Sequence, residues 1–211
     1  PTLADAQNTI KEIISQAKPE NRKLIAQSLD LSRLGSKLGK TEDAAKIMNV
    51  LATLDLPAAD MSKQLQAFFT GVTNQNYIWP DTSSDDVAYT FLKGLSEEGL
   101  KKLPDDFRIR LFKNLDAGNT ATEEYDMMVK VMKNASNTTK ADMIKYLMNQ
   151  DPTTAAQEKV IYQILDQTPY TDNLYLDLIG KIDLKQLAGE MENDAEAGKI
   201  AVSLLKAYDK T

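Results

Sequence analysis

The chain has 211 residues, 42% hydrophobic and 27% charged, which is enough for one ordinary domain or two small ones and too apolar for disorder. It contains no cysteine and no histidine, which excludes disulfides, thiolate metal sites, cysteine nucleophiles and imidazole chemistry. A net charge of -6 argues against binding to a nucleic-acid backbone. Composition therefore favours an acidic, globular, non-enzymatic protein that needs no cofactor or metal.

The chain shows no targeting or membrane signal. No apolar run reaches the roughly 18 residues of a membrane-spanning helix. The first four residues, 1–4, carry neither the basic nor the apolar region of a signal peptide. A start at Pro1 indicates a trimmed, processed or excised chain. Localisation stays open between a bacterial cytoplasm and secretion.

Apolar residues recur along the chain at helical spacing in repeated units. After Thr41 they follow at six, seven, nine, ten and thirteen residues, and most of these offsets share one stripe of a helix. The same pattern begins again at Thr82, Thr122 and Ala155 and, in a weaker form, at Ala4 and Ala195. The main stripes are Ile47, Met48, Val50, Leu51 and Leu54; Ala88, Tyr89, Phe91, Leu92 and Leu95; Met128, Val129, Val131, Met132 and Ala135; and Ile161, Tyr162, Ile164, Leu165 and Thr168. The last stripe is Ala201, Val202, Leu204, Leu205 and Tyr208.

Each stripe is followed by a chain-breaking residue and a second amphipathic segment. These second helices are expected at 19–29, 57–69, 96–103, 136–148 and 171–182, with an additional helix from Pro104 to Leu115. Thr41 is predicted to cap the N-terminus of one helix, and Gly35 to cap the C-terminus of the helix before it.

The fold expected from these elements is all-α. It comprises about five or six tandem helical hairpins of 33–41 residues, arranged as an α-α superhelix or as an irregular multi-helix bundle. A single domain over 1–211 is expected, with the loop 70–82 as the candidate sub-boundary.

Two segments resemble known helical proteins. Residues 122–146 resemble the first two helices of an annexin repeat, which implies a helical repeat over about a fifth of the chain. The annexin calcium loop needs two close glycines followed by threonine, whereas residues 117–120 read Ala-Gly-Asn-Thr, so the resemblance does not extend to calcium-dependent membrane binding. Residues 92–148 are also similar to helical repeats of large bacterial proteins that are secreted or linked to injection machines.

Several motifs invite a chemical interpretation, and a structural one explains each more simply. The glycines in 35–41 are one residue too close for a phosphate-binding loop, and 116–127 lacks the glycine and the glutamate of an EF-hand. Acidic pairs fall at predicted helix starts, where they complement the helix dipole: 85–86, 97–98, 105–106 and 123–124. Distant carboxylates that converge as in a glycosidase, and Arg33 or Arg108 as an arginine finger, remain weaker alternatives.

The segment 68–81 is the most distinctive candidate for binding. It interrupts the repeat and holds the only tryptophan of the chain. Because tryptophan and tyrosine often anchor interfaces, Phe69, Tyr77, Ile78 and Trp79 are predicted to contact a partner. The alternative is that Trp79 fills a gap between two hairpins.

A helical array presents an extended surface that suits binding better than catalysis. We therefore expect a non-enzymatic protein-interaction or structural scaffold module, bacterial and part of a secreted or delivery-linked system. The alternative is a secreted effector or toxin domain that acts on host proteins. A protein partner is expected, with no nucleic acid, small-molecule substrate, cofactor or metal.

Overall fold

The computed structural model describes residues 9, 12–14, 16–39, 41–73, 83–116, 122–150, 154–169, 173–190 and 194–208. Within these ranges the regular structure is helical and no strand occurs, which confirms the predicted all-α fold. The chain divides into two compact units, Pro1–Asn119 and Thr120–Thr211, so both sides of the loop 70–82 belong to the first unit. In the described ranges no helix is both long and apolar enough to cross a membrane.

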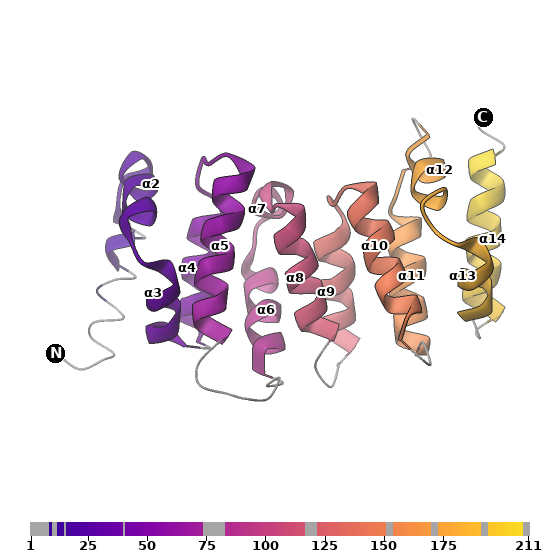
Figure 1. Cartoon of the computed structure of the whole chain (residues 1–211), viewed down its shortest axis with the longest axis horizontal. Coiled ribbons are helices and arrows are strands. Elements are labelled where there is room, and N and C mark those ends of the chain that lie inside the picture. The colour runs from indigo at the N-terminus through magenta and orange to yellow at the C-terminus, as the bar shows by residue number, and fades with distance from the viewer. Residues whose placement is uncertain are drawn as a thin grey trace. The chain divides into compact units, whose positions relative to one another are not determined.

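The first unit is built from two layers of helices (Figure 1). Its helices are α2 (Pro19–Ser28), α3 (Leu31–Leu38), α4 (Glu42–Ala52), α5 (Ala58–Thr73), α6 (Ser83–Gly94), α7 (Glu97–Lys102) and α8 (Asp105–Asp116). The helices α3, α5 and α8 pack in succession in one layer, and α4 packs against α6 in the other. Contacts of α4 with α5 and of α6 with α8 join the two layers.

The second unit repeats this arrangement. Its helices are α9 (Thr122–Met132), α10 (Asn137–Met148), α11 (Ala155–Asp166), α12 (Leu174–Ile179), α13 (Leu184–Glu190) and α14 (Asp194–Tyr208). In one layer α11 packs between α9 and α14, and in the other α10 contacts both α12 and α13. A helix in either layer is thus covered by the one that follows it in the same layer.

Four of the predicted apolar stripes, those that follow Thr41, Thr82, Thr122 and Ala155, contribute to the core. The sixth, tenth and thirteenth positions after each starting residue are buried in all four, as follows: Ile47, Leu51 and Leu54; Ala88, Leu92 and Leu95; Met128, Met132 and Ala135; Ile161, Leu165 and Thr168. The seventh position is half-buried in three of the four. The apolar spacing therefore identified both the helices and the face that each one buries.

Side-chain caps begin several of the helices. Thr41, Ser96 and Ser136 each accept a hydrogen bond from the backbone N–H three residues later, at 3.1–3.3 Å. At the start of α11, Thr154 and Gln157 form a reciprocal capping box. The cap predicted at Thr41 is confirmed.

The C-terminal cap predicted at Gly35 is wrong. The helix α3 continues through Gly35 to Leu38, and Gly39 ends it with a positive φ of 62°. Gly35 is instead buried inside α3, where its missing side chain lets the backbone of α5 approach closely. Gly35 therefore serves a close crossing of two helices rather than the end of one.

Candidate functional site

Arg108 holds a structural position inside the first unit. Its side chain is fully buried, and its guanidinium donates to the carbonyl oxygens of Leu103 at 2.9 Å, of Lys101 at 3.5 Å and of Leu100. Asp105 lies 3.6 Å from the same group as an ion pair. Burial lowers the pKa of Arg108 to about 10, so the group stays charged at neutral pH. A buried arginine that closes the end of α7 cannot serve as a finger toward a partner.

A second polar cluster fixes α8 on α5. Arg110 donates to the backbone oxygen of Gln66 at 3.2 Å and to the hydroxyl of Thr70 at 2.7 Å. Asp106 accepts hydrogen bonds from the Gln66 side chain at 2.9 Å and from Ser62. Burial lowers the pKa of Arg110. These groups satisfy one another across a helix interface, which accounts for them without a ligand.

Of the four residues predicted to contact a partner, only Phe69 lies in the described part of the chain. Phe69 is fully buried, with its ring 5.8 Å from that of Phe107 and the Arg110 guanidinium 5.1 Å from its centre. Its side chain therefore contributes to the core and presents no surface to a partner. Tyr77, Ile78 and Trp79 lie outside the described residues.

The acidic pairs stay at helix starts, as predicted. Asp105 and Asp106 are engaged by arginine and by polar side chains of the first unit, and Asp85 accepts a hydrogen bond from the N–H of Asp86 at 2.8 Å. No cluster of three metal-ligating side chains occurs in the described ranges. Residues 117–121 of the EF-hand-like segment 116–127 lie outside those ranges.

The last apolar stripe, which lies in α14, departs from the burial pattern of the four stripes described above. Ala201 and Leu205, the sixth and tenth positions after Ala195, are exposed, although the same positions are buried in the four stripes described above. Leu205 is 65% exposed and Val202 is 48% exposed. Of the α14 side chains that the structure describes, Ile200 and Ser203 are buried, because the helix turns a neighbouring face toward the rest of the unit. Ala201, Val202 and Leu205 of this weaker stripe therefore do not belong to the core.

The exposed stripe borders an apolar groove between α13 and α14, two helices that lie near each other at the C-terminal end of the second unit (Figure 1). The groove has a volume of about 170 Å³. Every side chain that lines it is aliphatic: Leu184, Leu187 and Ala188 of α13, and Ala197, Ile200, Ala201 and Leu204 of α14. Their spacing of three and four residues sets two helical stripes on facing sides of one hollow. We call this hollow the α13–α14 groove.

The sequence from which the α13–α14 groove is built is acidic. Residues 183–208 contain five carboxylates and three lysines. One of these lysines, Lys199, lies over the ring of Tyr162 at 5.2 Å and is directed toward α11. An apolar groove in an acidic stretch of sequence suits an apolar ligand that has basic flanks.

Ala201 and Leu204 belong to the last predicted stripe, whereas Leu184 and Leu187 were not singled out from the sequence. The spacing of Leu184, Leu187 and Ala188 was the available signal. Comparison with protein families, with curated proteins and with solved structures returns no match to this chain. The α13–α14 groove is thus assigned from its own geometry.

Proposed function

We propose that the protein is an interaction module whose α13–α14 groove holds an amphipathic helix of a partner protein. The observation that carries the proposal is the exposed stripe of α14. Ala201 and Leu205 hold the sixth and tenth positions of their stripe. These positions are buried in the four stripes described above, but in α14 they face solvent beside the α13–α14 groove. A contiguous apolar surface of this kind favours association, since a partner removes it from water.

A helix is the occupant that the surrounding architecture favours. Within the second unit α14 packs on α11, and α13 contacts α10, so each layer grows by adding a helix to the previous one. The α13–α14 groove continues the same two layers. A partner helix with apolar residues three and four positions apart would pack its stripe between the two facing stripes of the groove.

Charge favours a partner protein over a second copy of this chain. Residues 183–208 contain five carboxylates and three lysines, and the chain as a whole carries -6. Two copies would bring like charges together, whereas a helix with lysine or arginine beside its apolar stripe would meet opposite charges. The partner is therefore a basic amphipathic helix.

The test uses a synthetic helical peptide with leucines at positions i, i+3, i+4 and i+7 and lysines on its remaining face, labelled for fluorescence anisotropy. A peptide of the same composition in scrambled order lacks the apolar stripe. We expect saturable binding of the first peptide and at least about tenfold weaker binding of the second, because only the first can fill the groove.

Leu184→Glu supplies the site-specific variant and Leu174→Glu its matched control. Both leucines begin a short helix and are nearly equally exposed, at 41% and 42%, but only Leu184 lines the groove. Binding should fall about tenfold or more in Leu184→Glu, because a charge would be desolvated in the groove, and stay unchanged in Leu174→Glu. Circular dichroism checks that both variants remain helical.

Two outcomes would overturn the proposal. Equal binding by wild type and Leu184→Glu would place the peptide elsewhere. A wild-type dimer in analytical ultracentrifugation that Leu184→Glu converts to monomer would identify a second copy as the occupant.

A further inference from the structure

The side chains that line the α13–α14 groove are not of equal size along its length. Leu187 and Ile200, which are 3% and 5% exposed, form its floor. Residues 191–193 alone join the end of α13 at Glu190 to the start of α14 at Asp194. The two helix ends therefore lie at the same end of the groove, as in other helical hairpins with short connections. We call this the link end.

The link end is lined by alanines. Ala188 lies in the last turn of α13 and Ala197 in the first turn of α14. At a rise of about 1.5 Å per residue, Ala188 lies about 3 Å along α13 from its end, whereas Leu184 lies about 9 Å from it. Ala188 is exposed and Ala197 is half-buried, so a ligand can reach the space between them. Leucines narrow the groove farther from the link end, and alanines leave it wide here.

The volume of the groove fits one large apolar side chain. A cavity of about 150 Å³ lined by apolar side chains holds a molecule of benzene. The α13–α14 groove, at about 170 Å³, has room for one ring of that size. A phenyl group also buries more apolar surface than the side chain of leucine, so it gains more from leaving water.

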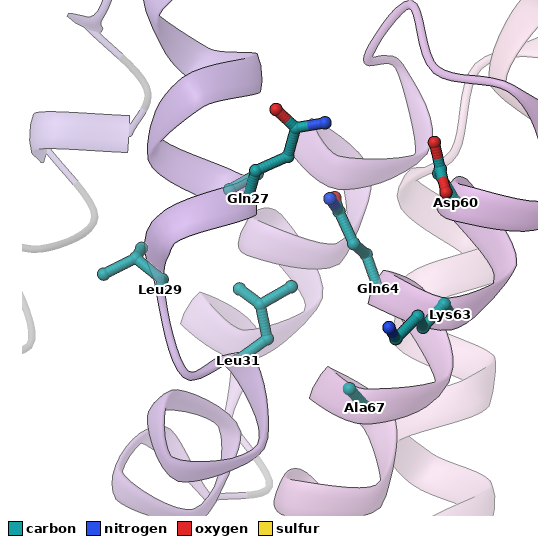
Figure 2. Close-up of a pocket in the computed structure, with 8 residues that line it drawn as sticks. Gln27, Leu29, Leu31, Asp60, Lys63, Gln64 and Ala67 are labelled. Atoms are coloured by element: carbon teal, nitrogen blue, oxygen red, sulfur yellow. The ribbon is translucent and has the colours of Figure 1, made fainter.

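The larger hollow between α2 and α5 of the first unit shows a contrasting chemistry. It has a volume of about 270 Å³, and Figure 2 shows Gln27, Asp60, Lys63 and Gln64 among the side chains around it. The described residues that line the α13–α14 groove are all aliphatic. Tyrosine and tryptophan usually need a hydrogen-bond partner for their polar group when they are buried. An aliphatic lining therefore favours phenylalanine among the aromatic residues.

We propose that the partner helix is anchored in the α13–α14 groove by one phenylalanine, whose ring lies between Ala188 and Ala197 on the floor of Leu187 and Ile200. The inference rests on the proposed function, because it names the side chain that the same groove selects. It makes Ala188 and Ala197 the residues that determine specificity, since a longer side chain at either position would take the place of the ring.

Two helical peptides with lysines on the polar face test the anchor. Both have leucines at positions i+3 and i+4 and alanine at i+7; the first has phenylalanine at i, and the second has alanine there. Alanine at i+7 makes the phenylalanine the only large terminal residue, whichever way the peptide lies in the groove. Fluorescence anisotropy should show at least about tenfold tighter binding of the phenylalanine peptide to the wild type, as burial of a ring predicts.

Ala188→Leu fills the link end from an exposed position of α13. Binding of the phenylalanine peptide should fall about fivefold or more, because the new leucine occupies the space of the ring. Binding of the alanine peptide should stay the same or become tighter. Ala195→Leu is the matched control: it adds the same side chain at an exposed position of α14 outside the groove, and it should change neither affinity. Circular dichroism checks that both variants remain helical.

The outcomes separate the anchor from the proposed function. Equal binding of the two peptides to the wild type, with Leu184→Glu weakening both, would overturn the phenylalanine anchor and leave the proposed function standing. An equal loss of both peptides in Ala188→Leu would also overturn the anchor, since a filled link end must spare the alanine peptide. If neither these peptides nor the leucine peptide binds, both proposals are overturned.

Discussion

Gly35 of α3 and Gly71 of α5 lie against each other where the two helices cross. A Cβ atom at Gly35 would stand 3.2 Å from the carbonyl carbon of Gly71 and 2.9 Å from the backbone nitrogen of Val72, and it would overlap the carbonyl oxygen of Phe68. A Cβ at Gly71 would in turn overlap the backbone of Ser32. Two glycines thus permit a contact between helix backbones that no other residue type allows.

Gly35→Ala is expected to lower the free energy of unfolding by about 2–3 kcal/mol, because the new methyl group meets backbone atoms that cannot move aside. Gly198→Ala is the control: it lies inside α14, a Cβ there would meet nothing within 4 Å, and alanine should raise stability by about 0.5–1 kcal/mol. Urea unfolding measures both. An unchanged or higher midpoint for Gly35→Ala would contradict the close crossing.

Arg108 supplies a second prediction about stability. Arg108→Met removes the donors that hold three backbone carbonyls around the end of α7 and leaves them buried or half-buried, which should cost about 3 kcal/mol. Arg33→Met, at an exposed position of α3, should change stability by less than about 0.5 kcal/mol. Equal effects of the two substitutions in thermal or urea unfolding would refute the structural role of Arg108.

The contact between Arg110 and Thr70 can be measured by a double-mutant cycle. Combining Arg110→Met with Thr70→Val should give a coupling energy of about 1 kcal/mol, because the two groups share a hydrogen bond of 2.7 Å. Thr73→Val is the matched control on the same helix, since the Thr73 hydroxyl donates to the Phe69 carbonyl of its own helix. Its coupling with Arg110 should be near zero, and equal couplings for the two threonines would mean that the cycle reports a general loosening of α5.

Much of the fold followed from the sequence because apolar spacing is a local signal. The offsets after Thr41 and Thr122 identified helices and buried faces, and the hydroxyl of Thr41 identified a helix start. Gly35 was misassigned because the same residue type serves a helix end and a close crossing, and only the position of α5 distinguishes the two. Local pattern cannot supply that information.

The candidate site was harder to predict for a related reason. Ala201 and Leu205 have the spacing of a core stripe, and their exposure depends on which face α14 turns toward α11 and α12. The aromatic segment drew attention by composition, yet Phe69 is enclosed by Phe107 and Arg110. The bacterial, secreted setting and the alternative role as an effector stay predictions.

Asp177 gives a prediction about pH. Hydrogen bonds from Lys181 and from Asn137, the latter at 2.8 Å, hold the pKa of the Asp177 carboxyl below its usual value of 3.8. Because the folded-state pKa is depressed, the stabilisation is present above the unfolded value and is lost as the pH falls through the lower folded value. These bonds join α12 to Asn137 at the start of α10, so the effect reports on the contact between the two helices.

Carbon-13 NMR of the aspartate side chains should therefore show Asp177 titrating below 3.8. Lys181→Met should raise that pKa the most, and Asn137→Ala should raise it by a smaller amount, in the order of their contributions. Gln186→Ala is the control, because its side chain bonds Asn149 instead and lies outside this network. A normal titration of Asp177 in the wild type would show that α12 does not hold its carboxylate against α10 in solution.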